Sequence, residues 1–241
     1  MSISFTVLSK QFWLYAILGG IAGATGNAFL VKALQKGELS ILGPVNSYKS
    51  VVGMILGIFM LAEIPNLWGI VGIALIIYGS YFVLDTTEEK FSWALLKKVE
   101  IQYRIWALIL TAIEAVFIKK VILLSSASIA FISWCWFGAF FSFLLLFVYR
   151  LDIKTQIKKV KYHDFSKLSL LVLCIGTMQF TTIYVFDHMP VGYALSLFQL
   201  STIISVLLGH HIFKEKDMLK KLIGAAIMIA GSVIIILLKD R

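Results

Sequence analysis

The sequence has little of the charge that a soluble domain carries on its surface. Only 15% of its 241 residues are Asp, Glu, Lys or Arg, whereas 60% are hydrophobic and the mean hydropathy is +0.92. A soluble domain is typically about 25% charged and about 45–50% apolar. Both differences exclude an ordinary soluble domain and indicate that lipid surrounds most of the chain. The length is enough for one membrane domain and leaves little for a soluble one.

Cysteine and catalytic motifs are also scarce. The only cysteines, Cys135 and Cys174, lie inside apolar segments, which argues against both a disulfide framework and a thiolate metal site. We therefore expect no metal and no cofactor. The HExxH, Walker A and GxSxG motifs are absent, so the sequence argues against an enzyme. An ATP-driven pump would need a nucleotide-binding domain, for which this chain is too short.

The net charge of +9 does not indicate a nucleic-acid partner. The basic residues sit in short loops between apolar runs and form no helical stripe. Basic loops between helices are what the positive-inside rule of membrane proteins predicts. The N-terminus also lacks the features of a signal peptide. Lys10 is the only charge before the first apolar run, and that run is too long for the hydrophobic region of a signal peptide.

Long hydrophobic runs are what the chain has in abundance. A run of about 18 or more apolar residues can cross the hydrocarbon core of a bilayer as a helix. Helix is the expected state because an open strand would leave backbone groups unpaired in lipid. The expected fold class is all-α, a polytopic bundle of about eight transmembrane helices, with spans at 13–34, 39–62, 67–84, 104–123, 127–149, 168–187, 190–212 and 219–238.

The order of features in residues 14–85 recurs, without gaps, in residues 166–237. Each copy has a polar residue within a helix, a tight turn, a long helix ending in Glu and a Gly-rich helix; the equivalent polar residues are Asn27 and Gln179, then Glu63 and Glu215. Each copy holds three helices, and the copies start five spans apart, an odd number, so if spans two to eight are continuous the copies have opposite orientations. Inverted repeats are typical of secondary transporters, whose substrate sites lie near the bilayer midplane.

The repeated segments resemble the EamA-like family of the drug/metabolite transporter superfamily. Ile41-Leu42-Gly43-Pro44 through Leu61-Ala62-Glu63, followed by Gly69 to Gly79, resembles the closing helices of an EamA repeat, and Phe213-Lys214-Glu215 to Gly231 resembles the same element in the second repeat. The family's usual form has ten helices as five plus five, and the resemblance implies that the first two are lacking here. It implies a partial first repeat of three helices at 1–85, a linker at 86–103 and a second repeat of five helices at 104–241.

An ionisable side chain inside the bilayer is costly and is a functional hypothesis by default. Glu114 has no charged neighbour for nine residues before it and four after it. It is a candidate proton or cation site or substrate contact, or else a structural partner of Lys49. Lys49 lies inside the second span beside Asn46 and Tyr48, and either binds an anionic substrate or neutralises Glu114. In the family this Glu114 position usually carries an aromatic residue that faces the cavity, so the resemblance supports its location rather than proton coupling.

The remaining candidates divide into two groups. Further substrate- or ion-binding candidates are Asn27, Gln179, Gln199, Tyr193 and Trp134, for which the alternatives are interhelical hydrogen bonds worth about 1 kcal/mol each and plain aromatic packing. Candidates for a hinge or gating role are Pro44, Glu63, Glu215 and Pro190. Pro44 is expected to kink or open the second span, because proline removes a helical hydrogen bond.

The resemblance implies a transporter that moves a small metabolite or drug-like molecule by alternating access. The expected partners are a small-molecule substrate, the lipid bilayer and, as one assembly, a second copy in a homodimer. The expected location is the cell or inner membrane of a bacterium. The alternative is a non-transporting membrane subunit or scaffold that assembles through small-residue helix faces such as Gly53 and Gly57.

The orientation has two conflicting expectations. Five Lys and Arg residues fall on the side that holds both termini, and sixteen fall on the other side, if all eight spans cross. The positive-inside rule then places both termini outside. The family resemblance implies cytoplasmic termini instead.

Overall fold

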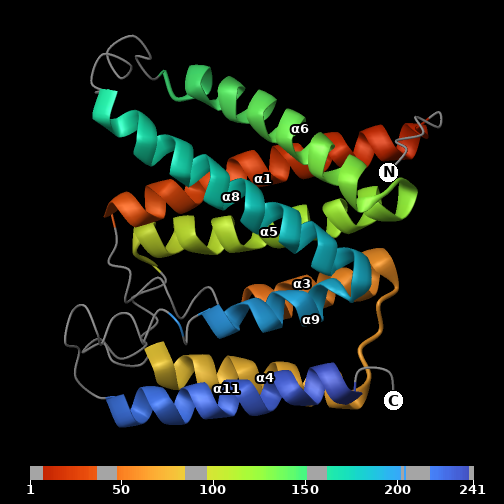
Figure 1. Ribbon diagram of the computed structural model, residues 1–241, viewed down its shortest axis with the longest axis vertical. Helices are drawn as coiled ribbons and strands as arrows, with labels where there is room; N and C mark the ends of the chain where they lie inside the picture. Colours follow the sequence, from red (N-terminus) through yellow and green to blue (C-terminus); the bar gives the residue numbers. More distant parts are fainter. Residues whose placement is uncertain are drawn as a thin grey trace. The chain divides into compact units, whose positions relative to one another are not determined.

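The computed structural model describes residues 8–36, 48–84, 97–150, 162–201, 204 and 218–238. Within these ranges the chain forms eight α-helices, one short 3-10 helix and no strand, which confirms the predicted all-α fold of about eight helices (Figure 1). The elements are α1 (Lys10–Lys36), α3 (Lys49–Leu61), α4 (Leu67–Leu84), α5 (Val99–Leu124), α6 (Ala127–Val148), α8 (Tyr162–His188), α9 (Val191–Leu197), η2 (Phe198–Leu200) and α11 (Met218–Leu238).

The described helices follow the predicted spans, with differences at polar ends. α4 has the predicted bounds, because Pro65 disfavours helix at the residue before it and Asn66 begins the new helix. α5 starts five residues before the predicted 104, with Glu100 in its first turn. α8 starts six residues before the predicted 168, with Asp164 in its first turn. A carboxylate there is favourable at the positive end of the helix dipole, so the helix continues past the apolar run.

Three described helices are long and apolar enough to cross a membrane, namely Lys10–Gln35, Ala127–Val148 and Asp164–His188. Shorter apolar helices are found at Lys49–Leu61, Leu67–Ser80, Val191–Leu200 and Leu222–Leu238. Large apolar side chains are exposed on the long helices, as Trp136 at 74% and Val172 at 71% illustrate. Exposed apolar surface on this scale is unusual for a monomer in water, and it is the surface that lipid accommodates.

The chain divides into two compact units, and neither is a continuous stretch of sequence. One unit contains Met1–Thr25 and Phe117–His188, and the other contains Gly26–Val116 and Met189–Arg241. The boundaries fall within α1, within α5 and between α8 and α9. Each unit therefore combines segments from both of the expected sequence repeats.

The first unit is built from the start of α1, the end of α5, and α6 and α8. α6 begins at an N-cap, where the Ser126 hydroxyl accepts a hydrogen bond from the Ile129 backbone N–H at 3.3 Å. α6 and α8 make contact, and the Phe131 and Phe180 rings meet edge to face with centroids 5.5 Å apart. Gly20 of α1 faces Phe137 of α6 so closely that a Cβ atom there would lie 2.6 Å from the Phe137 Cβ.

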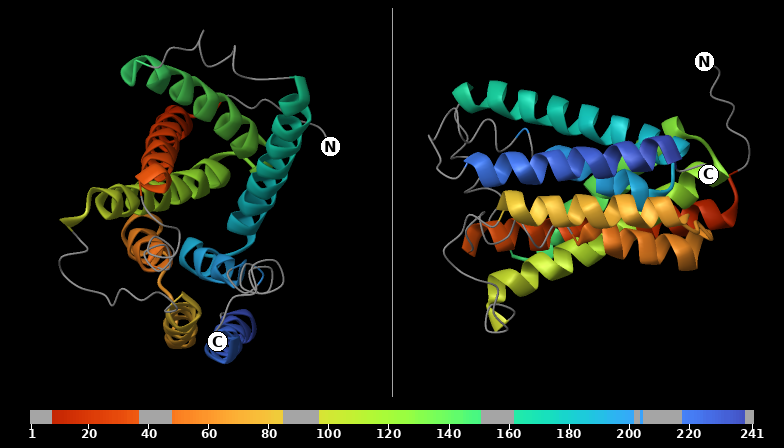
Figure 2. Two further views of the ribbon diagram at one scale, coloured as in Figure 1. Left: turned by 90° about the vertical axis from the view of Figure 1, so that its left-hand side faces the viewer. Right: turned by 90° about the horizontal axis from the view of Figure 1, so that it is seen from below.

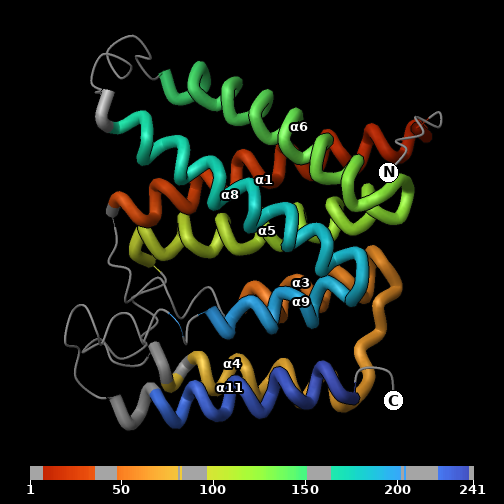
Figure 3. The backbone as a smooth tube through the Cα atoms, in the orientation of Figure 1, coloured from red at the N-terminus to blue at the C-terminus, as the bar shows by residue number. Residues whose placement is uncertain are grey.

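The second unit contains two helix pairs, α3 with α9 and α4 with α11. The members of the second pair lie side by side in both views of Figure 2 and in Figure 1. The segment Ala62–Asn66 connects α3 to α4, and its path can be followed in Figure 3. Ala62 caps α3 in the left-handed conformation with φ 56°, which ends the helix at Leu61. Apolar side chains from α4, α9 and α11 form the buried cluster Ile73, Ile76, Tyr193, Met228 and Ile235.

Glycines set the close approach of α4 and α11. A Cβ atom on Gly72 would lie 2.8 Å from the Gly231 carbonyl oxygen, and one on Gly79 would lie 2.6 Å from the Gly224 carbonyl oxygen. Residue number rises along one helix as it falls along the other, so the pair is antiparallel. Small residues allow such backbone contact between helices in a membrane.

This contact is reciprocal with respect to the sequence repeat. Superimposing 14–85 on 166–237 makes Gly72 equivalent to Gly224 and Gly79 equivalent to Gly231. The Gly72–Gly231 contact therefore becomes the Gly224–Gly79 contact when the two copies are exchanged. Contacts that exchange in this way are those expected around a two-fold axis.

Candidate functional site

The second unit holds a group of charged side chains on α3 and α5. Lys49, the first residue of α3, is attracted by the Glu114 carboxylate and repelled by the Arg104 guanidinium, both of which are carried by α5. All three side chains are partly buried. The predicted neighbours Glu114 and Lys49 are thus brought into interaction from helices that are distant in the sequence.

α9 and the 3-10 helix η2 that follows it carry three buried polar side chains in the same unit. Tyr193 and Ser196 of α9 and Gln199 of η2 recur at three-residue spacing, which places them along one side of this helical segment. Their exposed fractions are 3%, 0% and 7%. The Ser196 hydroxyl donates to the Gly192 carbonyl at 2.9 Å, so it serves its own helix. The predicted candidates Tyr193 and Gln199 are therefore interior residues.

The Tyr193 hydroxyl is held by Asn66, a residue that our sequence reasoning did not select. The hydroxyl donates to Asn66 Oδ1 at 3.2 Å and accepts from the Asn66 backbone N–H at 3.2 Å. Asn66 Oδ1 also accepts from the Gly69 backbone N–H at 2.7 Å, as an N-cap of α4 does. Asn66 Nδ2 donates to the Leu238 carbonyl at 2.7 Å. Asn immediately before an apolar helix is a capping signal in sequence, but its link to Tyr193 is visible only in the structure.

Glu63 lies in the same α3–α4 connection and contacts the start of α9. Its Oε2 atom accepts a hydrogen bond from the Val191 backbone N–H at 2.8 Å. Pro190 precedes that N–H and lacks one of its own, as suits the start of a helix. A small cavity here is lined by Met54, Glu63, Pro65, Pro190, Gly192 and Tyr193. Its volume is about 10 Å³, roughly the space for one water.

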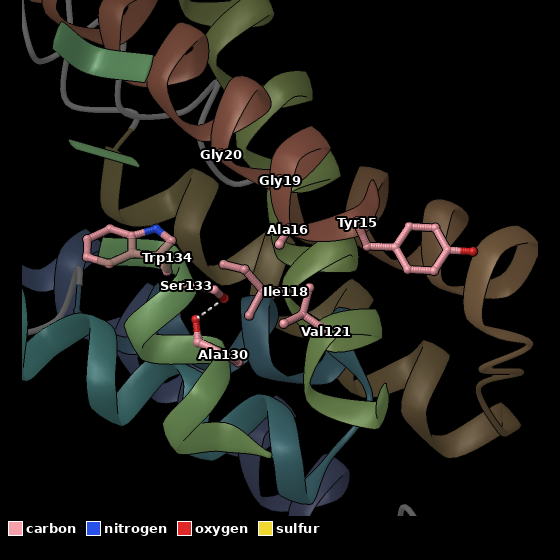
Figure 4. Close-up of a pocket in the computed structure, with 9 residues that line it drawn as sticks. All are labelled: Tyr15, Ala16, Gly19, Gly20, Ile118, Val121, Ala130, Ser133 and Trp134. Carbon is pink, nitrogen blue, oxygen red and sulfur yellow. Dashed lines mark hydrogen bonds between the residues drawn. The ribbon is translucent and has the colours of Figure 1, made fainter. Parts of the chain in front are cut away.

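The first unit has a second small cavity, lined by residues of α1, α5 and α6 that include the predicted Trp134 (Figure 4). Small side chains from Ala16, Ser133 and Ala130 surround its centre, while the Tyr15 and Trp134 rings point outward on opposite sides. The Ser133 hydroxyl donates to the Ala130 carbonyl at 2.9 Å. This cavity also has a volume of about 10 Å³, so it holds no more than about one water.

Lys119 is a second residue that sequence reasoning placed differently. Lys119 is one of the five Lys and Arg residues that the expected spans place on the side of the termini, whereas in the structure it lies in α5, is 8% exposed and is buried in the first unit. Its ammonium donates to the Phe186 carbonyl and, at 3.4 Å, to the Asp187 carbonyl at the end of α8. Its neighbour Lys120 lies 4.5 Å from the Tyr15 ring centroid. A lysine close to the end of an apolar run was the only signal in the sequence.

The other predicted residues are separate from these groups. Asn27 is exposed on the part of α1 in the second unit, and Gln179 is partly buried on α8 in the first. Tyr48 is 56% exposed at the start of α3. Pro44, Asn46 and Glu215 lie outside the described residues. Among the residues that the structure describes, no group of three or more His, Cys, Asp or Glu side chains could hold a metal ion.

Comparison with known proteins adds to this geometry. No curated protein matches the chain. One solved crystal structure superimposes with a TM-score of 0.69 over 98% of this chain and 90% of the other, at 15% sequence identity. At that identity the likeness shows the fold alone. Residues 2–85 and 100–237 match the sequence profile of the EamA-like transporter family. The match covers nearly the whole chain, and this integral membrane protein therefore belongs to the EamA-like transporter family.

Proposed function

We propose that the chain is a secondary transporter, an exporter or a permease, that moves a small metabolite or drug-like molecule by alternating access. The observation that carries the proposal is the interaction of Lys49 with Glu114 among apolar helices. Charges inside a membrane protein are costly, face the bundle interior and mark substrate or ion pathways. A family of transporters for small substrates supports the same conclusion. The proposal requires neither ATP hydrolysis nor other enzymatic chemistry.

The reciprocal packing of α4 and α11 supports the alternating-access part of the proposal. In inverted-repeat transporters, one repeat rocks or gates against the other around a site between them. The three helices within 1–85 and the five within 104–241 are the proposed repeats. The contacts of Gly72 with Gly231 and of Gly79 with Gly224 are those that such repeats share.

We propose that the chain lies in the inner membrane of a bacterium. Neither of the two small cavities described above could hold a metabolite, since each has a volume of about 10 Å³, whereas small-molecule sites are typically about 300–1,000 Å³. A homodimer stays a prediction.

A flux measurement in proteoliposomes tests the proposal. Vesicles would be loaded in turn with a radiolabelled amino acid, a sugar, a nucleotide derivative and a cationic dye. We expect the wild-type chain to release at least one class, and Glu114→Gln to lower that flux by about tenfold through loss of the charge that Lys49 faces. Glu100→Gln, at the first turn of the same helix, is the matched control and should keep the flux.

One result would contradict the role of Glu114, and another would contradict the transport function itself. Unchanged flux in a folded Glu114→Gln protein would exclude a role for this carboxylate in transport. An absence of flux for every class, together with a stable complex with another membrane protein, would favour the scaffold alternative.

A further inference from the structure

The break between α8 and α9 brings two helix ends next to each other in the sequence. α8 ends at His188 and α9 begins at Val191, with only Met189 and Pro190 between them. Helix ends leave backbone groups without intrahelical partners, namely carbonyl oxygens at a C-terminus and N–H groups at an N-terminus. Where a helix end is buried, as at Val191, these groups need partners from the protein.

A positively charged side chain caps the C-terminal end of α8. Lys119 is buried, and its ammonium donates to the Phe186 and Asp187 carbonyls. The C-terminus of a helix carries a partial negative charge, so a lysine there is favourable as well as hydrogen-bonded. The last residue of α8 is His188, whose Nδ1 atom lies 2.9 Å from the Tyr184 carbonyl oxygen.

A negatively charged side chain caps the N-terminal end of α9. The Glu63 carboxylate accepts from the Val191 backbone N–H at 2.8 Å, and Val191 is fully buried. Charge-assisted hydrogen bonds of this kind are stronger than neutral ones. Asn66, three residues after Glu63, holds the Tyr193 hydroxyl two residues further along α9. The α3–α4 connection thus fastens the first turn of α9 at two points.

We infer that Lys119 and Glu63 are positioning residues at the α8–α9 break. Within the first unit Lys119 holds the end of α8, and within the second unit Glu63 holds the start of α9, with its buried Tyr193 and Ser196, in place for transport. The charge of each side chain suits the helix end that it contacts. The Lys119 ammonium donates to carbonyl oxygens at the end of α8, and the Glu63 carboxylate accepts from an N–H at the start of α9. Neither side chain needs to touch the transported molecule. The claim that the two side chains hold the helix ends rests on their hydrogen bonds. The claim that this affects transport rests on the proposed transport function.

Hydrogen exchange, which needs no substrate, tests the structural part. The full chain would be placed in lipid nanodiscs, and backbone exchange would be followed by mass spectrometry in peptides covering residues 186–194. We expect Lys119→Met and Glu63→Ala each to accelerate exchange there by about tenfold, as loss of a hydrogen bond to a charged group implies. Lys119→Arg and Glu63→Gln, which keep a donor and an acceptor, should restore most of the protection.

Matched controls distinguish a local loss of protection in residues 186–194 from a general destabilisation of the protein. Lys120→Met removes the neighbouring ammonium, which faces the Tyr15 ring, and Glu100→Gln removes an acidic side chain from the first turn of α5. Both should leave exchange in 186–194 unchanged, and peptides within α6 should be unchanged in every variant. Wild-type exchange in folded Lys119→Met and Glu63→Ala proteins would overturn the inference.

Flux tests the consequence once the panel described above has identified a transported compound. A residue that positions a helix end without contacting the compound should change the maximal rate and leave the concentration for half-maximal flux almost constant. We expect Lys119→Met and Glu63→Ala to lower the maximal rate by about tenfold, with recovery in Lys119→Arg. Accelerated exchange together with wild-type flux would overturn the role in transport. If the wild-type chain moves no compound, the transport function fails, while the exchange result still decides whether the two caps hold the break.

Discussion

At the residue scale, the Tyr193 hydroxyl shows how much depends on a single buried atom. It lies between the backbone N–H and the Oδ1 of Asn66, and it is also close enough to α4 that a Cβ on Gly69 would overlap it. This hydroxyl therefore joins α9 to the start of α4. Loss of the hydroxyl would remove one hydrogen-bonding partner from the Asn66 backbone N–H and one from Asn66 Oδ1.

Tyr193→Phe should destabilise the protein by about 0.5–1.5 kcal/mol, because it removes a hydrogen-bonding partner of the partly buried Asn66 while keeping the ring. The measurement is the free energy of unfolding by SDS titration in mixed micelles. Tyr78→Phe is the matched control, since Tyr78 is 55% exposed on α4. Equal losses in the two variants would show that the Asn66–Tyr193 hydrogen bonds contribute nothing specific.

Lys49 and Glu114 should behave as a coupled pair. Each single replacement, Lys49→Met or Glu114→Gln, leaves one charge without the opposite charge that it faces now. We expect the double variant to lose less stability than the sum of the two single losses, with a coupling energy of about 0.5–3 kcal/mol. The same unfolding titration measures the cycle. Strictly additive losses would show that the two charges do not stabilise each other.

At the element scale, the α4–α11 pair depends on the absence of side chains at its contact positions. A Cβ on Gly79 would meet the Gly224 carbonyl at 2.6 Å and the Met228 backbone nitrogen at 2.9 Å. Backbone atoms cannot turn aside as a flexible side chain does. The two helices would have to separate along much of their length.

Gly79→Ala should therefore destabilise the protein by about 1–3 kcal/mol, the usual cost of overpacking. Gly138→Ala on α6 is the matched control, because nothing lies within 4 Å of its Cβ position. That control should be neutral or stabilise by up to about 1 kcal/mol through helix propensity. Thermal unfolding in detergent compares the two. A Gly79→Ala protein as stable as Gly138→Ala would contradict the close packing of α4 and α11.

At the scale of the whole molecule, the distribution of Lys and Arg predicts the orientation in the membrane. If all eight spans cross, sixteen of these residues fall on the side opposite the termini and four on the terminal side, since Lys119 is buried within α5. The positive-inside rule therefore predicts that both termini face outside. A single cysteine introduced at the N-terminus, after Cys135→Ser and Cys174→Ser, should react with a membrane-impermeant maleimide in intact cells. Labelling only after the cells are opened would support the cytoplasmic termini that the family resemblance implies.

Much of the fold follows from hydrophobic runs alone. α4 has the predicted bounds, because an apolar run between Pro65-Asn66 and a polar segment leaves one place for a helix. The early starts of α5 and α8 were missed, because Glu100 and Asp164 look like linker residues when only hydropathy is read. They stabilise helix ends through the dipole, an effect that hydropathy does not contain.

The candidate site was predictable only in part. Glu114 and Lys49 were selected because a charge in an apolar run is costly whatever surrounds it. Asn66 and Lys119 were missed, because their roles come from the residues that they meet. Asn66 meets Tyr193, 127 positions away, and Lys119 meets Phe186, 67 positions away.

The amino-acid sequence by itself determines that this protein lies in a membrane and that it is helical, and it predicts that residues 14–85 and 166–237 are repeats. Lipid cannot satisfy backbone hydrogen bonds, so a long apolar run has to become a helix irrespective of its neighbours. Only the tertiary structure decides which helices touch and which polar groups meet. The reciprocal glycine contacts of α4 with α11 and the caps of the α8–α9 break depend on distances between remote segments, and those distances are set by packing.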